Sequence, residues 1–264
     1  MCRRHTRGAV LGGALTAWSG VFIPDGFEHV REERTSILVR SDAREWLVPL
    51  LMAGDRGWAG YAMRALPGGR GGAVVVRVDE HEVVLRTCRR GGLPARVLHD
   101  TYFGWTPRPF RELCLLETLR RGGVPVVEVV GARVRWLVPG CYKGWIVTRY
   151  VRDACTLWEW VCGGDGQWQR PAVWRLVGKA IRRLHDAGSR HPDLNLRNIL
   201  LCPGTEAPTV LLVDFDRPLW SGVHGPDADL VRLRRSARKL DPQGSRVTAA
   251  DLEDLLAGYG EASP

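Results

Sequence analysis

The chain has 264 residues, of which 45% are hydrophobic and 25% are charged. These values are ordinary for a globular protein and exclude a disordered or collagen-like chain. Lys and Arg number 38 against 29 Asp and Glu, and the resulting net charge of +9 favours acidic partners such as nucleotides, nucleic acids or an anionic membrane.

The seven cysteines are odd in number and form no C-x-x-C pair, so we expect a reducing compartment and neither a disulfide framework nor a zinc site. No uncharged stretch reaches the roughly 20 apolar residues that a membrane helix needs. Residues 9–24 resemble a weak signal peptide, but glycines interrupt the run and no convincing cleavage site follows. We therefore predict that residues 1–35 are a disordered extension.

The first half of the chain is rich in predicted strands. A short helix is expected over residues 43–53, and four glycines between positions 68 and 72 lie between strand-like runs, which is typical of a hairpin with a Gly-rich turn. A further strand is predicted from Glu82 to Thr87. Three more strand-like runs are expected between residues 124 and 151.

One helix interrupts these strands. It is predicted over residues 107–121, with Thr106 as its cap and Gly122 at its end. Glu112 projects from beside its apolar face.

The second half has the period of helices. Residues 171–187 carry an apolar stripe with a period near 3.6, and further helices are predicted over 227–240 and 249–257, the last capped by Thr248. Two short strands, 199–202 and 209–213, lie between them. This order predicts an α+β fold with two lobes and a cleft between them. The strand-rich N-lobe is expected over 36–150 and the helix-rich C-lobe over 151–264.

The most informative segment runs from His191 to Leu201 and reads H-P-D-L-N-L-R-N-I-L-L. It contains both asparagines of the chain, Asn195 and Asn198. A strand-like run follows and ends in D-F-D at residues 214–216. Polar residues are therefore concentrated in two loops that flank short apolar strands.

These two loops are predicted to meet. Asp193 and Asn198 can turn into one cleft, and a strand that pairs with residues 199–202 would bring Asp214 back beside Asn198. Carboxylate and amide oxygens suit Mg²⁺, which takes its remaining ligands from phosphate and water. Phosphoryl transfer needs such an ion and a carboxylate that accepts the proton of the attacking hydroxyl.

The spacing H-x-D-x-x-x-x-N followed by D-F-D resembles the catalytic core of the protein-kinase-like superfamily. The form H-x-D-L-N-x-x-N-I-L-L, together with the L-R-x-x-x-R-G-G-L block that begins at Leu85, resembles one family closely. This family is the 3-deoxy-D-manno-octulosonic acid (Kdo) kinases, within the Kdo/heptose lipopolysaccharide kinases. The resemblance runs from about residue 60 to 239 and implies a two-lobed protein-kinase-like fold that uses ATP and Mg²⁺.

The resemblance also implies a role for individual residues. Asp193 would be the catalytic base, and Asn198 and Asp214 would hold the metal. Gly69 and Gly71 would let backbone amides approach the ATP phosphates.

Two further residues would grip ATP. Glu112 would fix the basic residue that holds the α- and β-phosphates. Protein kinases use lysine for this, but no lysine precedes Lys143 here, and Arg86 stands in the matching place. A guanidinium can bind phosphate with two hydrogen bonds and always stays charged. Thr148 to Val151 would form the segment between the lobes that lines the adenine pocket.

Several of these residues have plainer interpretations. The glycines alone are compatible with a simple hairpin turn, and His191 is better explained as a structural histidine that braces the loop than as a catalytic one. Asp216 is open to a purely stabilising role. The basic run of helix 227–240 is open to interpretation as a solvated face; it contains Arg232, Arg234, Arg235, Arg238 and Lys239.

The function implied by the resemblance is phosphorylation of the Kdo sugar, at its 4-hydroxyl, in a Kdo-lipid A precursor during lipopolysaccharide biosynthesis. The enzyme would be peripheral on the cytoplasmic face of the Gram-negative inner membrane. Candidates for docking there are Arg89, Arg90, Arg96, Arg120 and Arg121.

Other functions stay open at this point. A heptose kinase, or another sugar or antibiotic kinase of the same fold, would use the same core loop. A nucleotide-binding scaffold without catalysis would not need Asp193, Asn198 and Asp214 together. A nucleic-acid partner is not expected, because this constellation is that of a phosphotransferase.

Overall fold

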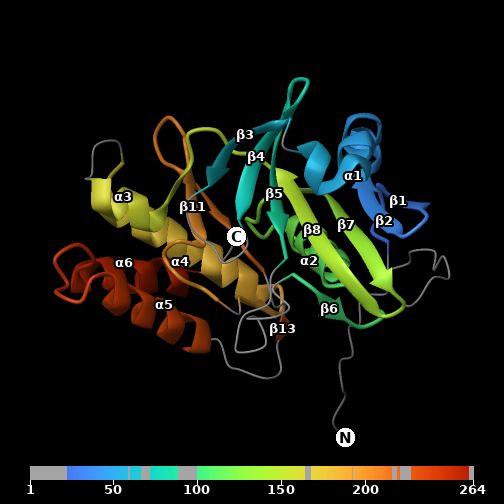
Figure 1. Ribbon diagram of the computed structural model, residues 1–264. Coiled ribbons are helices and arrows are strands. Elements are labelled where there is room, and N and C mark those ends of the chain that lie inside the picture. Colours follow the sequence, from blue (N-terminus) through green and yellow to red (C-terminus); the bar gives the residue numbers. More distant parts are fainter. Residues whose placement is uncertain are drawn as a thin grey trace, which may run out of the picture.

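The computed structural model describes residues 23–58, 60–66, 72–88, 100–163, 168–191, 193–215, 219–220 and 227–261. It has an antiparallel sheet in its N-terminal part and a helical C-terminal part (Figure 1), so the predicted α+β class is confirmed. None of the described helices is both long and apolar enough to cross a bilayer.

Eight of the described strands form one sheet, in the order β1-β2-β7-β8-β5-β4-β3, with β6 paired to β8. Every pairing in it is antiparallel. The strands are β1 (Phe27–Glu32), β2 (Thr35–Arg40), β3 (Ala62–Leu66), β4 (Ala73–Val78), β5 (His81–Thr87), β6 (Tyr102–Phe103), β7 (Val129–Val138) and β8 (Cys141–Arg149).

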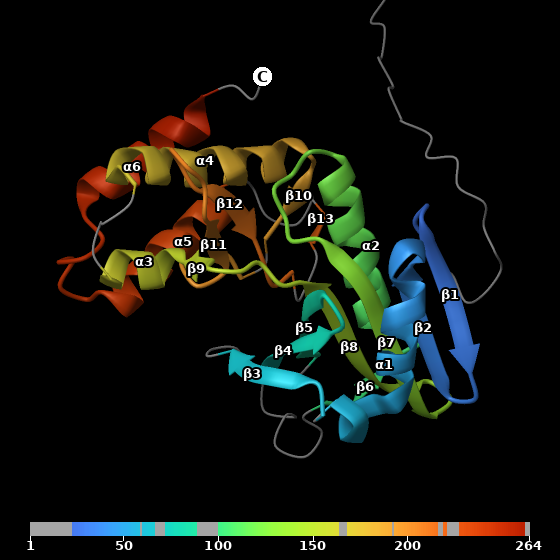
Figure 2. The ribbon, with the colours of Figure 1, turned by 90° about the horizontal axis from the view of Figure 1, so that it is seen from above.

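A helix covers each face of this sheet (Figure 2). The short helix η1 (Ser41–Ala43) leads into α1 (Arg44–Trp58), and α2 (Arg108–Arg121) follows β6. Side chains alternate between the two faces along β2: Ile37 and Val39 pack in the core under α1, while Leu38 packs in the core that includes α2. The second core continues into the C-terminal part, and α2 therefore connects the sheet to the helices.

The C-terminal part consists of helices around short strands. Its elements are β9 (Cys155–Thr156), α3 (Leu157–Gly163), α4 (Arg170–Asp186), β10 (Ser189–Arg190), β11 (Ile199–Cys202), β12 (Thr209–Leu212), β13 (Leu219–Trp220), α5 (Asp227–Leu240) and α6 (Ala249–Gly260). The strands β12, β11 and β9 form one small sheet, and β10 pairs with β13.

Helices α4 and α6 touch through their backbones. A Cβ at Gly178 would lie 2.0 Å from the carbonyl oxygen of Leu255, and one at Gly258 would lie 2.1 Å from that of Arg175. Only glycine permits this approach, which gives α4 a fixed support behind the loop that follows it. The predicted cap of α6 is confirmed, because Thr248 and Asp251 form a reciprocal capping box.

Three expectations need correction. The predicted extension of residues 1–35 is wrong for its last part, because β1 and β2 form a regular hairpin from Phe27↔Arg40 to Glu32↔Thr35. Residues 1–22 lie outside the described part. The sequence of β1 is only weakly apolar, so its order depends on the buried strand β2 beside it.

The other two corrections concern α2 and the segment after it. Thr106 does not cap α2: the N-cap is Pro107, and the backbone N–H of Arg108 instead donates to the Tyr142 hydroxyl, 2.9 Å away. The expected strand over residues 124–130 is reduced to an isolated bridge, Val126↔Leu212, before β7 begins at Val129. This bridge joins the segment that follows α2 to strand β12 of the C-terminal part.

Candidate active site

The loop between β10 and β11 is held by its own asparagines. The side-chain amides of Asn195 and Asn198 both donate to the carbonyl oxygen of Asp193, over 2.8 and 2.9 Å. The Asn195 side-chain oxygen accepts from the backbone N–H of Arg197 at 2.9 Å. These bonds fix the loop around Asp193, whose side chain is exposed.

Asp214 lies beside Asn198 because of the pairing between β11 and β12. Ile199 pairs with Leu212, and the N–H of Val213 donates to the Asn198 carbonyl at 3.0 Å. The backbone of Asp214 is left-handed, with φ of 67°. This conformation is uncommon for a residue other than glycine and is typical of functional sites.

Arg86 joins this loop to the sheet and to α2. Its guanidinium donates to Oε1 of Glu112 and lies 3.1 Å from Oδ1 of Asp214. The Glu112 side chain is only 1% exposed, whereas those of Arg86 and Asp214 are 22% and 34% exposed. One cation thus links β5, α2 and the segment after β12, with its charge fixed between two carboxylates.

His191 braces the loop from inside. It is fully buried, and burial lowers the pKa of its imidazole, which therefore stays neutral near pH 7. Its Nδ1 accepts from the N–H of Asp193 at 3.3 Å, so Nε2 is the nitrogen that carries the proton and donates to the Val213 carbonyl at 2.8 Å. The ring also contacts Phe215, with 4.4 Å between centroids. This geometry supports the structural interpretation of His191.

Asp229, on α5, bonds to the same loop, and the sequence did not indicate this role. Its Oδ2 accepts from the backbone N–H of His191 at 2.8 Å and lies 3.1 Å from Nε2 of His185. Burial opposes its ionisation, but the bonds from His185 and His191 outweigh burial and lower the pKa of Asp229. Arg232 adds a bond to Oδ1 and another to the His191 carbonyl. In the sequence Arg232 lies in the basic run of helix 227–240, and nothing in that run indicates Asp229 or the His191 carbonyl as its partners.

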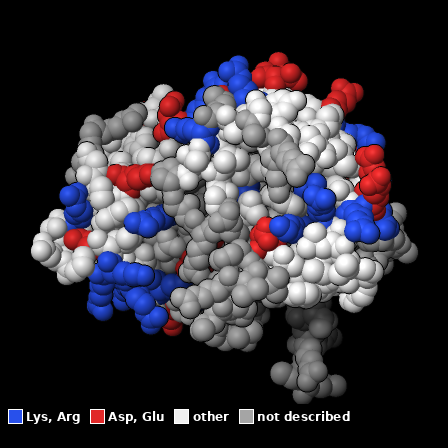
Figure 3. All heavy atoms as spheres, viewed as in Figure 1, with Lys and Arg blue, Asp and Glu red and all other residues white. Residues whose placement is uncertain are grey.

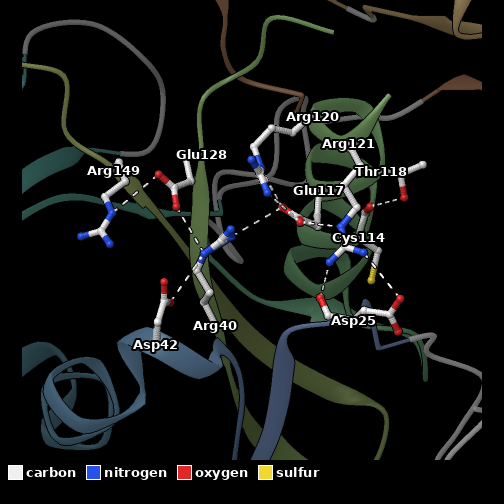
Figure 4. Close-up of polar contacts among 10 residues, drawn as sticks. All are labelled: Asp25, Arg40, Asp42, Cys114, Glu117, Thr118, Arg120, Arg121, Glu128 and Arg149. Atoms are coloured by element: carbon white, nitrogen blue, oxygen red, sulfur yellow. Dashed lines mark hydrogen bonds and ion pairs between the residues drawn. The ribbon is translucent and has the colours of Figure 1, made fainter. Parts of the chain in front are cut away.

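The C-terminal half of α2 is held by a second buried carboxylate, Glu117, which is 1% exposed. Figure 4 shows Arg120 and Arg121 of α2 and Arg40 of β2 pointing to it. Arg120 donates to both of its oxygens at 3.0 Å, Arg121 donates at 2.7 Å, and Arg40 lies 4.0 Å away. Burial disfavours the ionised form of Glu117, but the hydrogen bonds and charges of these arginines outweigh burial and lower the pKa of Glu117.

This cluster also connects α2 to the N-terminal hairpin. Arg40 donates to Glu128 at 3.2 Å, and Arg121 donates to the carbonyl of Asp25 (Figure 4). Because Glu112 is on the same helix, the cluster supports the position from which Glu112 holds Arg86. The helical spacing of Glu117 with Arg120 and Arg121 is visible in the sequence, whereas Arg40 comes from a separate segment that only folding brings near.

The remaining predicted site residues are placed as follows. Gly69, Gly71 and Asp216 lie outside the described residues, as do Arg89, Arg90 and Arg96. The predicted interlobe segment Thr148 to Val151 covers the end of β8, where the N–H of Tyr150 donates to the Glu82 carbonyl at 3.0 Å.

A divalent metal would find oxygen ligands at Asn198 and Asp214. Oδ1 of Asp214 is buried and accepts no hydrogen bond within the described part of the chain, although Arg86 is near. One carboxylate and one amide oxygen fit Mg²⁺, which uses few protein ligands. Within the same residues no group of three His, Cys, Asp or Glu side chains gathers to hold a metal. Two protein oxygens would leave coordination positions on the ion for phosphate and water.

Comparison with known proteins gives consistent matches. Residues 61–259 match the lipopolysaccharide kinase (Kdo/WaaP) family. A 3-deoxy-D-manno-octulosonic acid kinase of Actinobacillus succinogenes is 36% identical over 180 residues, which are 66% of this chain and 74% of that protein. The protein of the same name from Xylella fastidiosa is 33% identical over 211 residues, or 76% and 80% of the two chains.

A solved structure of WaaP in complex with acyl carrier protein has a similar fold. Its TM-score is 0.55 at 17% sequence identity, and the match covers 83% of this chain and 88% of the other. At this identity the likeness extends to the fold alone.

The buried neutral His191 predicts a pH dependence of stability. Below its ordinary pKa of 6.5, the imidazole takes up a proton in the unfolded chain but not in the folded one, so the free energy of unfolding falls as the pH falls. We expect His191→Gln to reduce the slope between pH 7 and 5 by up to about 1.4 kcal/mol per pH unit, measured by urea unfolding. His29, whose pKa is also lowered by burial and by Arg31, accounts for part of the remaining slope, which His29→Gln should reduce further. Equal slopes in the parent chain and in His191→Gln would contradict the assignment.

The cluster at the end of α2 predicts an unequal effect of two similar substitutions. Glu117→Gln leaves three arginines around a buried neutral group and should lower the free energy of unfolding by about 1–3 kcal/mol. Glu28→Gln is the matched control, because the Glu28 side chain is 41% exposed and pairs with Arg44, which is itself 50% exposed; its effect should stay within about 0.5 kcal/mol. Urea titration at pH 7 separates the two, and a cost at Glu117 as small as that at Glu28 would show that the cluster is not stabilising.

Proposed function

The chain belongs to the lipopolysaccharide kinase (Kdo/WaaP) family, and we propose that it is an ATP-dependent kinase that phosphorylates the Kdo sugar of a Kdo-lipid A precursor during assembly of the lipopolysaccharide inner core. The Kdo 4-hydroxyl is the proposed acceptor position. The names of the relatives support the sugar. The observation that carries the chemistry is Arg86, which lies between Glu112 and Asp214 next to the loop of Asp193.

The ATP phosphates would be held from the sheet. Glu112 fixes the Arg86 guanidinium, which can offer further N–H groups to the α- and β-phosphates. Gly69 and Gly71 are proposed to bring backbone amides to the same phosphates. In this arrangement residues 36–150 would supply the phosphate grip and residues 151–264 the catalytic and metal loops.

The metal would be held by Asn198 and Asp214. When bound, Mg²⁺ neutralises charge on the phosphate oxygens during transfer. The pairing of β11 with β12 brings the backbones of Asn198 and Asp214 side by side, and the Asp214 carboxylate lies 3.1 Å from the Arg86 guanidinium. These two residues would therefore orient the transferred phosphate toward the acceptor.

Asp193 would act as the base. Its carboxylate is exposed, while its backbone N–H and carbonyl are both engaged within the loop. The carboxylate can accept the proton of a sugar hydroxyl as that oxygen attacks the γ-phosphorus. The hydrogen bonds from Asn195 and Asn198 end on the backbone carbonyl of Asp193, so they hold the loop without occupying the carboxylate.

The acceptor lipid would lie in the cytoplasmic leaflet of the inner membrane, and we propose that the enzyme binds there as a peripheral protein. Two of the arginines predicted to dock, Arg120 and Arg121, are engaged with Glu117. A heptose or other sugar kinase remains the alternative within the fold. A scaffold without catalysis remains the alternative outside it.

Acceptor specificity can be tested directly with ATP labelled in the γ-phosphate. We expect label transfer to a Kdo-lipid A precursor and little transfer to a heptosylated core, with mass spectrometry placing the phosphate on Kdo. Transfer to the heptosylated core alone would assign a heptose kinase. ATP binding without transfer to any acceptor would favour the scaffold.

The base role predicts that Asp193→Asn lowers kcat by about 10²–10⁴. The KM for ATP should change little, because Arg86 and Glu112 are untouched. Asp186→Asn is the control: this exposed aspartate pairs with Arg182 on the outside of α4 and should leave kcat unchanged. A kcat of Asp193→Asn close to that of the parent enzyme would remove Asp193 from the mechanism.

A further inference from the structure

The outer face of α5 carries a cluster of exposed cations. Asp229, Leu233 and Ala237 are buried and four residues apart, so they define the inner face of the helix. Four exposed cations lie on the opposite face, and we call them the α5 cations: Arg234, Arg235, Arg238 and Lys239. Val231, on the same side, is 51% exposed. In Figure 3, blue side chains gather over the position of α5 in Figure 1.

The α5 cations differ from Arg40, Arg120 and Arg121 in their electrostatic surroundings. Within the described part of the chain, none of the four lies within 4.0 Å of a carboxylate oxygen, whereas Arg40, Arg120 and Arg121 all pair with Glu117. Asp241, which follows α5, is already used by the backbone N–H groups of Arg246 and Val247. The charge of this face is therefore not compensated by its described neighbours.

This arrangement is unfavourable for an isolated helix. Arg234 and Arg238 are four residues apart, as are Arg235 and Lys239, and like charges at this spacing repel. A dense anionic surface would convert the repulsion into attraction. Long basic side chains on two successive turns can reach several phosphate groups in one plane.

The same helix is directly attached to the catalytic loop. Asp229 accepts from the N–H of His191 at 2.8 Å, and Arg232 donates to its carbonyl, also at 2.8 Å. Asp193 is only two residues further along. A surface that binds the outer face of α5 therefore also fixes the position of the proposed base relative to that surface.

We propose that the α5 cations form the docking face for the anionic lipid headgroups of the membrane that contains the acceptor. The inference rests on the proposed function, which places the acceptor sugar on a lipid. It assigns binding to a different set of residues from the arginines singled out by the sequence. The phosphates of the membrane surface are the ligand, and binding is electrostatic and sensitive to salt.

The test is sedimentation of the full chain with vesicles of phosphatidylcholine alone or with phosphatidylglycerol added. We expect the parent chain to bind only the anionic vesicles, and replacement of all four α5 cations by alanine to lower the partition coefficient at least tenfold. The matched control instead removes four exposed cations from the N-terminal part of the chain, with the substitutions Arg34→Ala, Arg44→Ala, Arg77→Ala and Arg135→Ala, and should bind within about threefold of the parent chain.

Activity on a Kdo acceptor without acyl chains separates this proposal from the proposed function. The α5 variant should phosphorylate that soluble acceptor at the rate of the parent chain and lose activity only on acceptor in vesicles. Equal vesicle binding by the α5 variant and the control would overturn the docking face. So would equal binding of the parent chain to neutral and anionic vesicles, the result expected if this face binds an acidic protein. Failure of the parent chain to phosphorylate either acceptor would instead refute the proposed function.

Discussion

A single guanidinium between two carboxylates holds the candidate site together. Glu112 is almost completely buried, and a buried carboxylate without a partner is strongly destabilising. Arg86 supplies that partner from β5 and contacts Asp214 with its other side. Because arginine does not lose its proton in proteins, this link between the sheet, α2 and β12 is permanent over the whole physiological pH range. A lysine could not hold two carboxylates with the same planar geometry.

The buried polar side chains of the C-terminal part hold the loop that contains Asp193. The exposed polar side chains of the same region are not needed for this and can contact substrate or membrane. His191 is neutral and bonds to backbone on both sides, and Asp229 is ionised and bonds to the loop from α5. Asp193 and the α5 cations, by contrast, face outward. The proposed base and the proposed docking face thus both belong to one hydrogen-bonded unit, through which α5 is attached to the loop of Asp193.

The N-terminal hairpin also contributes charged contacts to α2, although it precedes the matched family region, which begins at residue 61. Arg40 and the carbonyl of Asp25 both reach the Glu117 cluster on α2. Glu117 and Glu112 lie on the same helix, and each is buried against arginine. The helix is therefore fixed near both ends by charge pairs: Glu112 faces the candidate site, and Glu117 faces a hairpin that the family match does not include.

The sequence by itself determined the local features: the helix of α4 from its apolar stripe, β11 and β12 from their short apolar runs, and the kinase-like spacing of Asp193, Asn198 and Asp214. It also indicated Arg86, since no lysine precedes residue 143. Tertiary structure alone decided the hairpin of β1 and β2, the contact of the start of α2 with Tyr142, and the contacts of Glu117 with Arg40 and of Asp229 with His191. Periodicity and spacing report on neighbours along the chain, whereas these buried carboxylates also depend on groups that only folding brings near them.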